Sequence, residues 1–322
     1  MSEERYTYAV ARVRAKESTL LNKAALDQLL ACKTSEDCLR ALAERGWGSE
    51  STRTAEEMLK AETEKTWQFL NSVLPDAHTL DVFRLSADFH NLKAAIKQVC
   101  TEQETPNVFC EGGTIPAAQI LAAVQEQRFE SLPAALAAPG RQCFDILLHT
   151  RDAQLCDLAL DKACLEAIAQ KGRCEKNEAL RLYAETTVAC ADIRIAVRCC
   201  KTKKSAELIR QSLAECSSIS VPLLAKAAAE STEAIAAYLL TTAYADGVEA
   251  LKTSLSAFEC WCDSFLIRRL QPQRYNPFTI GPLAGYLLAR ESEIKSVRLI
   301  LSAKRNGLAE QTIRERLREC YV

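Results

Sequence analysis

The sequence predicts an all-α fold, and three observations support this prediction. Glycine and proline are scarce, at 10 and 9 of 322 residues, while alanine, leucine, glutamate and arginine dominate, and this composition favours helices nearly throughout. Alternating runs of β-branched residues, which a half-buried strand would show, are absent from the sequence. A segment with helical spacing occurs near the end of each third of the chain.

The recurring segment reads "DFHNLKAAIKQV" at 88–99, "CADIRIAVRCCK" at 190–201 and "IKSVRLILSAK" at 294–304. Its central aliphatic residue is Leu92, Ile193 or Val297, so the copies lie 101 and 104 residues apart. Apolar side chains around each centre fall at helical spacing, and such a stripe predicts a face that packs into a core. We interpret the pattern as a triplication.

Two details of the repeated segment go beyond periodicity. A basic residue follows the central aliphatic residue in every copy, as Lys93, Arg194 and Arg298. The third copy also has a charged residue, Arg290, at one of the five positions of its stripe, which are Leu287, Arg290, Ile294, Val297 and Leu301.

The repeat extends into the connectors that follow the first two copies. These connectors read "EGGTIP" (111–116) and "ECSSISVP" (215–222), and the helical text after them matches at an offset of 103 residues, with Leu132 over Ile235. Glycine, serine and proline of this density mark breaks between helices. We therefore predict three helical repeat domains, at 1–112, 113–215 and 216–322.

Composition and charge exclude several classes of protein. The net charge is −1 and no basic run is longer than Lys203-Lys204, whereas a nucleic-acid binder would show a basic stripe. Charge-free stretches are far shorter than the roughly 18–20 residues that span a bilayer, and the first residues do not read as a signal peptide. We predict a cytoplasmic protein that does not bind nucleic acid.

The fifteen cysteines occur in helical text, with no C-x-x-C spacing and only His78, His90 and His149 as histidines. Zinc sites need paired ligands on tight turns. We therefore expect reduced, buried cysteines that act as small hydrophobic residues in a reducing cytosol, and no metal.

Motifs for catalysis are missing from the sequence. It contains no phosphate-binding glycine loop, no dinucleotide fingerprint and no G-x-S-x-G elbow. We expect a protein with no active site, no cofactor and no small-molecule substrate. An all-helical enzyme that works through His90 and a thiol such as Cys100 is the alternative from the enzyme class.

Three segments carry a resemblance to a known family. They are "YAVARVRAKESTLL" (8–21), "LSADFHNLKAAIK" (85–97) and "NPFTIGPLAGYLLARESEIKSVRLILSAKRNGL" (276–308). The chain resembles, from end to end, the C subunit of the V-type (A-type) rotary ATPases, which is the counterpart of the d subunit in the eukaryotic V-ATPase. The positions that match the family's signature are Arg12, Arg14, Asn276, Pro277, Gly281, Tyr286, Glu291, Glu293 and Arg298.

The resemblance implies a fold and a set of partners. Three similar helical domains would stand around a pseudo-threefold axis and form a funnel. The wide mouth would receive the central stalk, made of subunits D and F, and the opposite face would rest on the membrane ring of proteolipid subunits. One copy per complex would transmit rotation for ion transport, peripherally attached to the membrane and without catalysis of its own.

Six residues are candidates for the stalk interface or for contacts between the domains: Asp88, Asn91, Lys93, Arg194, Glu293 and Arg298. The competing interpretation is that they form helix–helix hydrogen bonds that hold the three domains together. Exposed ion pairs contribute only about 0–1 kcal/mol each, so charges would set orientation and partner choice in such a socket. The functional alternative is an unrelated cytoplasmic helical-repeat scaffold, although solenoid repeats usually have periods of about 20–50 residues.

Overall fold

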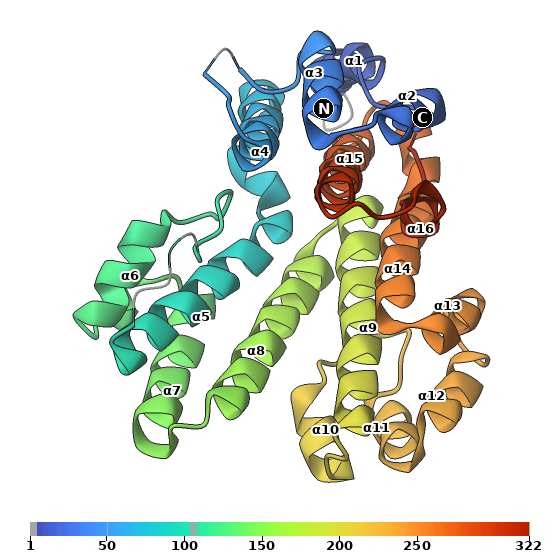
Figure 1. Cartoon of the computed structure of the whole chain (residues 1–322). Coiled ribbons are helices and arrows are strands. Elements are labelled where there is room, and N and C mark those ends of the chain that lie inside the picture. The colour runs from blue at the N-terminus through green and yellow to red at the C-terminus, as the bar shows by residue number, and fades with distance from the viewer. Residues whose placement is uncertain (1–4, 50, 104–105, 107, 322) are drawn as a thin grey trace. The chain divides into compact units, whose positions relative to one another are not determined.

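The computed structural model describes residues 5–49, 51–103, 106 and 108–321. Its regular structure in these ranges consists of α- and 3₁₀-helices, with no strand, which confirms the all-α prediction (Figure 1). The chain divides into two compact units. Unit 1 comprises Met1–Thr79, Asn177–Leu182 and Glu249–Val322, and unit 2 comprises Leu80–Lys176 and Tyr183–Val248.

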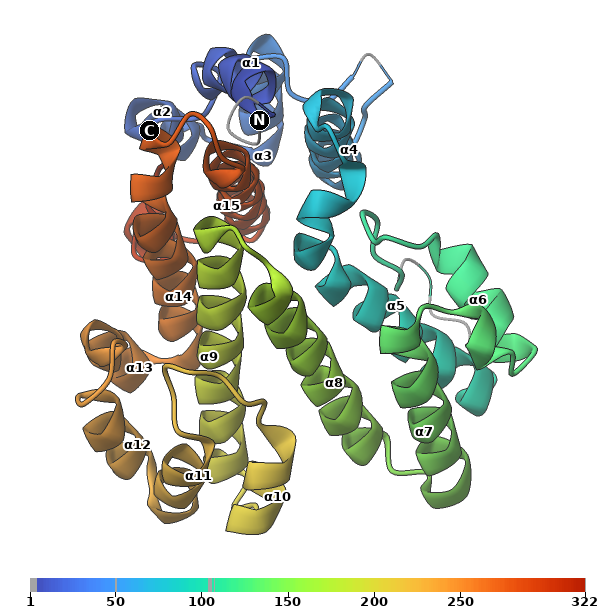
Figure 2. The same cartoon turned by 180° about the vertical axis from the view of Figure 1, so that it is seen from behind.

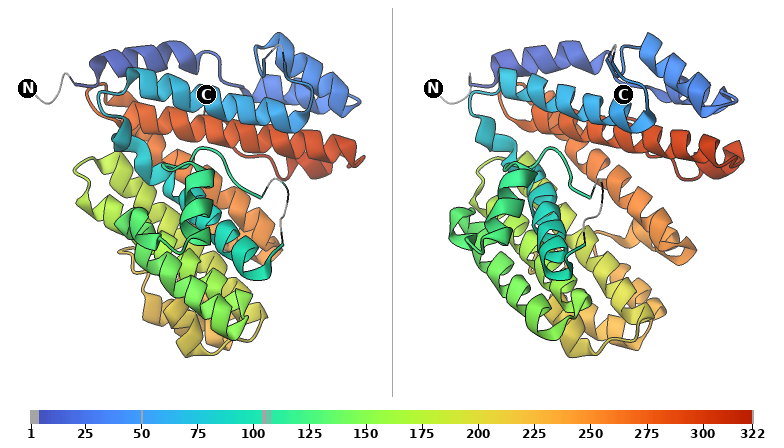
Figure 3. Two further views of the ribbon diagram at one scale, coloured as in Figure 1. Left: turned by 90° about the vertical axis from the view of Figure 1, so that its left-hand side faces the viewer. Right: turned by 60° about the vertical axis from the view of Figure 1, so that its left-hand side comes forward.

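Unit 1 is built around one long central helix, α15. Its main helices are α1 (Thr7–Glu17), α2 (Lys23–Ala31), α3 (Ser35–Glu44), α4 (Ala55–Val73), α14 (Leu255–Leu270), η4 (Gln271–Tyr275), α15 (Gly281–Arg305) and α16 (Glu310–Arg314). Helix α15 packs against α1, α3, α4, α14 and α16. Both views in Figure 3 show α1, α4 and α15 running alongside one another.

Local sequence explains where two of these helices begin. Thr34 precedes α3 and Thr54 precedes α4, and each threonine forms a capping box with the residue three positions on, Asp37 or Glu57. The hydroxyl accepts from one free amide while the carboxylate accepts from the other, which satisfies two donors that a helix start leaves open.

The core of unit 1 joins α2, α3, α4 and α15. Leu29, Leu42, Leu59 and Val297 are all buried in one apolar cluster. Val297 is the central aliphatic residue of the third repeat copy, so its stripe faces the core as predicted.

Unit 2 consists mainly of helical hairpins. Its elements are α5 (Leu85–Thr101), α6 (Ala117–Gln125), η2 (Phe129–Ser131), α7 (Ala134–Thr150), α8 (Ala153–Cys174), α10 (Ala206–Ser212), α11 (Val221–Glu230), α12 (Thr232–Leu239) and η3 (Ala245–Gly247). Helix α5 packs against α6, α7 and α8, and α7 packs against α8, as Figure 2 shows from behind. Three elements cross between the units along the chain: η1 (Ala77–Phe83), α9 (Glu178–Lys201) and α13 (Val248–Thr253).

The first two repeat copies occupy α5 and α9. Their central residues, Leu92 and Ile193, are fully buried, so both stripes face a core as predicted. The predicted boundaries after 112 and after 215 both lie within unit 2, and the three-domain division stays a prediction.

Candidate functional site

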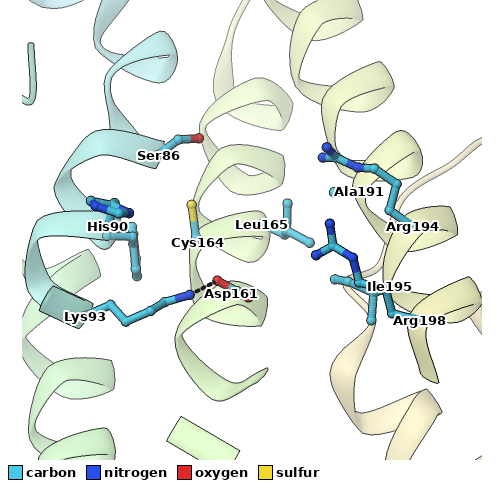
Figure 4. Close-up of a pocket in the computed structure, with 11 residues that line it drawn as sticks. Ser86, His90, Lys93, Asp161, Cys164, Leu165, Ala191, Arg194, Ile195 and Arg198 are labelled. Carbon is cyan, nitrogen blue, oxygen red and sulfur yellow. Dashed lines mark hydrogen bonds and ion pairs between the residues drawn. The ribbon is translucent and has the colours of Figure 1, made fainter. Parts of the chain in front are cut away.

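Helices α5, α8 and α9 line a cavity of about 270 Å³ in unit 2 (Figure 4). Four basic side chains border it: His90 and Lys93 from α5, and Arg194 and Arg198 from α9. The acidic residue of the lining is Asp161 of α8, which forms an ion pair with Lys93. We call this feature the basic groove and define it by these five residues.

The lining of the basic groove carries more positive than negative charge. Lys93, Arg194 and Arg198 carry three positive charges, and Asp161 carries one negative charge. The remaining lining includes the apolar side chains of Phe89, Leu165 and Ile195.

Two of these charges come from equivalent positions of the predicted repeat. Lys93 and Arg194 each directly follow the buried central residue of their stripe, Leu92 or Ile193. The structure thus brings two of the six candidate residues into one cavity. Arg298, the third equivalent, lies exposed on α15 in unit 1.

Asp88 holds the connector that follows α5. Its carboxylate is fully buried; Oδ1 accepts from the amides of Thr114 (2.8 Å) and Ile115 (3.3 Å), and Oδ2 accepts from the Thr114 hydroxyl (2.6 Å). Burial raises the pKa of Asp88, and these hydrogen bonds oppose the shift. A Cβ on Gly113 would lie 2.3 Å from Asp88 Oδ1, so the connector can approach this close because residue 113 is glycine.

Asn91 holds the same connector one helical turn further on. Its Nδ2 donates to the Cys110 carbonyl (2.9 Å), and its Oδ1 accepts from the Cys110 amide (2.7 Å). Asn91 is 1% exposed, so its amide is fully engaged inside the protein. Both residues therefore bind a loop of their own unit, and whether either also contacts a partner or a neighbouring domain stays a prediction.

Asp192, which aligns with Asn91, makes the equivalent contact in the second copy, because it also accepts a hydrogen bond from a backbone amide. Its Oδ1 accepts from the amide of Ala214 (3.1 Å), the residue immediately before the second connector, and Oδ2 has no hydrogen-bond partner among the described residues. The side chain is fully buried. Burial raises the pKa of Asp192 to about 8, with Glu215 adding to the shift and the Ala214 amide and Lys162 opposing it.

We expect Asp192→Asn to stabilise the protein at neutral and alkaline pH, by about 1–3 kcal/mol near pH 8. The folded protein holds a proton on Asp192 up to about pH 8, whereas an unfolded aspartate loses it near pH 4. The wild type therefore loses stability as the pH rises between these values, and asparagine, which does not ionise, removes that loss. Urea unfolding of both proteins from pH 5 to pH 8 measures the difference.

Asp246→Asn is the matched control, because Asp246 is exposed in the same unit. We expect its pH dependence to follow the wild type. Parallel stability curves for Asp192→Asn and the wild type would show that Asp192 is ionised in the folded protein at neutral pH.

Unit 1 contains a buried ionic network centred on Arg290. Its guanidinium donates from Nη1 to Glu293 Oε2 (2.5 Å), from Nη2 to Glu62 and from Nε to the Thr66 hydroxyl (3.3 Å). Arg290, Glu62 and Glu293 are 6%, 4% and 8% exposed, so solvent screens these charges weakly. The Trp47 ring, 5.0 Å from the guanidinium carbon, covers the group.

The two carboxylates of this network also accept hydrogen bonds from backbone amides in two loops. Glu293 accepts from the Leu21 amide between α1 and α2, and Glu62 accepts from the Gly48 amide (2.9 Å) between α3 and α4. Burial raises the pKa of Glu293 to about 7, against the opposing effect of Arg290. Glu293, a candidate interface residue, therefore has its partners within unit 1.

Several family-signature residues shape α15 and the turn before it. Tyr286 is buried with its ring edge-on to Phe69, at 5.7 Å between centroids. A Cβ on Gly281 would lie 2.9 Å from the Gln273 carbonyl, which favours glycine at the start of α15. Asn276 and Pro277 lie exposed in the turn itself.

The remaining signature positions carry charge. Arg12 donates to the Tyr8 hydroxyl (2.7 Å), and Arg14 forms an ion pair with Glu17 (2.7 Å), the last residue of α1. Both contacts therefore lie within α1. Glu291 of α15 is partly exposed; loss of hydration raises its pKa to about 7, and Lys295 opposes the shift.

Sequence reasoning missed four charged residues that the structure brings into these sites: Glu62, Asp161, Arg198 and Arg290. Arg290 had a visible signal, since it is the charged position in an otherwise apolar stripe. No sequence signal identified Glu62 or Asp161, because the partner of each lies far away along the chain. Glu62 is 228 residues from Arg290, and Asp161 is 68 residues from Lys93.

Two features are absent from the described residues. They contain no group of three or more histidine, cysteine, aspartate or glutamate side chains placed to hold a metal ion. Among them, no helix is long and apolar enough to cross a membrane.

The chain matches known proteins over nearly its whole length. The profile of the ATP synthase (C/AC39) subunit family matches residues 9–316. The C subunit of a V-type sodium ATPase from Enterococcus hirae is 24% identical over 271 residues, covering 82% of this chain and 81% of the relative. The C subunits of the A-type ATP synthases from Methanocaldococcus jannaschii and Thermococcus kodakarensis are each 24% identical, covering 97% and 96% of this chain and 86% and 89% of the relatives. The chain belongs to the ATP synthase (C/AC39) subunit family.

Proposed function

We propose that this chain is the non-catalytic subunit that couples the rotating stalk of a V/A-type ATPase, subunits D and F, to the membrane proteolipid ring for ion transport. The observation that carries the proposal is the family match, which runs from residue 9 to residue 316 and so takes in nearly all the helical structure of both units. The relatives are named as C subunits of V-type and A-type enzymes and are covered over four fifths or more of their length.

We further propose the three-domain funnel, with repeats at 1–112, 113–215 and 216–322, as the architecture that receives the stalk. In support, the first two repeat helices use the same device. Asn91 of α5 and Asp192 of α9, which align in the repeat, each accept a hydrogen bond from the backbone amide of the residue just before the connector that follows, Cys110 or Ala214. A shared contact of this kind is expected of duplicated units.

The stalk contact is proposed for the basic groove and for Arg298. Of the six candidate residues, Asp88, Asn91 and Glu293 are buried and engaged within their own unit, whereas Lys93, Arg194 and Arg298 retain exposed surface. Complementary charge steers association and fixes orientation, so an acidic surface on the stalk would suit these side chains.

Native mass spectrometry of the chain mixed with its cognate subunits D and F tests the proposal. We expect a 1:1:1 complex that persists at moderate salt and weakens as the ionic strength rises, because charge contributes to the contact. A folded, helical chain that binds neither stalk nor proteolipid ring would instead support the alternative of an unrelated helical scaffold.

Charge reversal maps the contact. We expect Arg194→Glu and Arg298→Glu each to weaken stalk affinity by about tenfold, that is by about 1.4 kcal/mol. For Arg298→Glu, at an exposed position, we expect little change in thermal stability. Arg210→Glu on α10 and Arg305→Glu on α15 are the matched controls, since both arginines are exposed in the same units. Equal losses of affinity in the controls and in the Arg194 and Arg298 variants would point to a general charge effect. Loss of stability without loss of binding would assign Arg194 and Arg298 a structural role.

A further inference from the structure

Two neighbouring turns of unit 2 carry basic residues at one end of the unit, which lies at the bottom of Figures 1 and 2. The α7–α8 turn contains Arg151, and the end of α9 with the turn after it contains Lys201, Lys203 and Lys204. The Lys204 ammonium donates to the side-chain oxygen of Gln154 near the start of α8 (3.1 Å), and α8 packs against α10. The two turns are therefore neighbours in space.

Few acidic residues offset this charge. The segments 148–155 and 201–210 contain five lysines and arginines and two acids, which leaves a surplus of three positive charges in a chain whose net charge is −1. One acid, Asp152, accepts hydrogen bonds from two amides in the first turn of α8 (2.9 and 3.1 Å), and the other, Glu207, forms an ion pair with Arg210 (3.1 Å). The next acid on α7, Asp145, lies six residues before Arg151.

Exposed leucines lie beside these charges. Leu148, in the last turn of α7, is 53% exposed, and Leu155, in the first turn of α8, is 39% exposed. Leu155 also lines a cavity of about 470 Å³ between α7, α8 and α10, together with Ile146, Leu158 and Leu208. The polar lining of that cavity includes Thr150, Lys162, Glu166 and Gln211. Positive charge, exposed apolar side chains and a partly apolar recess thus occur together.

We propose that this end of unit 2 binds the surface of an anionic lipid bilayer. The lipid-binding surface is defined by Leu148, Arg151, Leu155, Lys201, Lys203 and Lys204. The basic side chains contact lipid phosphates, and the leucines reach the boundary between headgroups and acyl chains. Cations and leucines at the same turns suit this boundary, because each kind of side chain is satisfied at its own depth.

The lipid-binding surface is distinct from the stalk contact proposed above. None of its six residues lines the basic groove. Binding to lipid therefore does not depend on the rotary function, and a chain that binds subunits D and F without binding vesicles would separate the two proposals.

Vesicle sedimentation with the full, folded chain tests the proposal. One set of vesicles is made of phosphatidylcholine alone, and the other is an about 7:3 mixture of phosphatidylcholine and phosphatidylglycerol. We expect the chain to bind the mixed vesicles at least about tenfold more tightly, and this binding to weaken as the ionic strength rises. Equal binding to both kinds of vesicle, or binding to neither, would overturn the proposal.

Removal of two positive charges tests the position of the contact. We expect Lys201→Gln combined with Lys203→Gln to weaken binding to the mixed vesicles about thirtyfold, since each basic side chain near an anionic membrane contributes about fivefold. Arg173→Gln combined with Lys176→Gln is the matched control, because both residues are exposed at the opposite end of α8 and just beyond it. An equal loss in the control would show attraction without regard to position, which contradicts the proposal.

Removal of the two leucines distinguishes a bilayer from an acidic protein surface. We expect Leu148→Ser combined with Leu155→Ser to weaken vesicle binding about tenfold, because the leucines lose apolar contact with the lipid. Leu240→Ser, at an exposed leucine just after α12, should bind as the wild type does. Unchanged binding in the double leucine variant would mean that charge alone attracts the chain, and would favour an acidic protein partner over lipid.

Amide exchange of the wild type locates the contact without any substitution. We expect slower exchange at 148–155 and at 199–205 in the presence of the mixed vesicles, and no change at 170–176. Protection elsewhere on the chain, with none in the two turns, would overturn the proposal even if a variant does not fold.

Discussion

Replacing Arg290 with methionine is expected to lower the free energy of unfolding by about 3–5 kcal/mol, because the change leaves two carboxylates buried without their common partner. Glu62 and Glu293 both receive hydrogen bonds from this guanidinium, and all three side chains are less than a tenth exposed. Methionine fills similar volume, so the loss reports charge rather than a cavity. Urea unfolding at pH 8 measures it.

The pH dependence of the same variant gives an independent check. Burial already raises the pKa of Glu293 to about 7 against the opposing effect of Arg290, and without that guanidinium its protonated form is favoured further, so we expect the loss in Arg290→Met to be smaller at pH 5 than at pH 8. Arg305→Met, at the exposed end of α15, is the control and should change stability by less than about 0.5 kcal/mol.

Neutralising the carboxylates offers a further test of the cause. In the background of Arg290→Met, the changes Glu62→Gln and Glu293→Gln should restore more than half of the lost stability, since the amide oxygens can still accept from the Gly48 and Leu21 amides. A triple variant as unstable as Arg290→Met would show that the guanidinium acts through packing on Trp47 instead.

The sequence predicted the helices and the buried stripes because both depend on residues that are close along the chain. Leu92, Ile193 and Val297 are fully buried at the centres of their helices, as their spacing indicated. Helical period is a local property, and burial of an apolar stripe follows from it with little further information.

Roles that depend on a distant partner could not be predicted in this way. The pattern marked Asp88 and Glu293 as important, yet it did not distinguish a carboxylate that binds another protein from one that binds a loop of its own chain. The choice depends on where Thr114 and Leu21 lie in space. The charged position in the third stripe, Arg290, could have been recognised as a buried charge that needs a partner, whereas nothing near Glu62 identifies it as that partner.

The basic groove shows an intermediate case. The repeat predicted that Lys93 and Arg194 would be equivalent, and they do line one cavity. Their convergence with Arg198 and Asp161 depends on how α5, α8 and α9 pack, which the sequence pattern does not specify.

The contact between Asp88 and its connector predicts the second large effect. We expect Asp88→Ala to lower the free energy of unfolding by about 2–4 kcal/mol, because the Thr114 and Ile115 amides and the Thr114 hydroxyl lose their acceptor in a buried place. Removing a buried carboxylate relieves part of its desolvation cost, which keeps the loss below the sum of three hydrogen bonds. Asp88→Asn keeps one acceptor oxygen and should cost less than alanine.

A double-mutant cycle that combines Gly113→Ala with Asp88→Ala tests this expectation. In the wild type, Gly113→Ala would place a methyl group 2.3 Å from Asp88 Oδ1, so the loop must move and hydrogen bonds to the carboxylate must lengthen. In the Asp88→Ala background that clash is gone, and the same substitution should cost less by about 1 kcal/mol or more, a coupling typical of residues in contact. Additive losses would mean that the connector is held mainly by Asn91, and amide exchange at 110–115 in each single variant would then show which residue protects it.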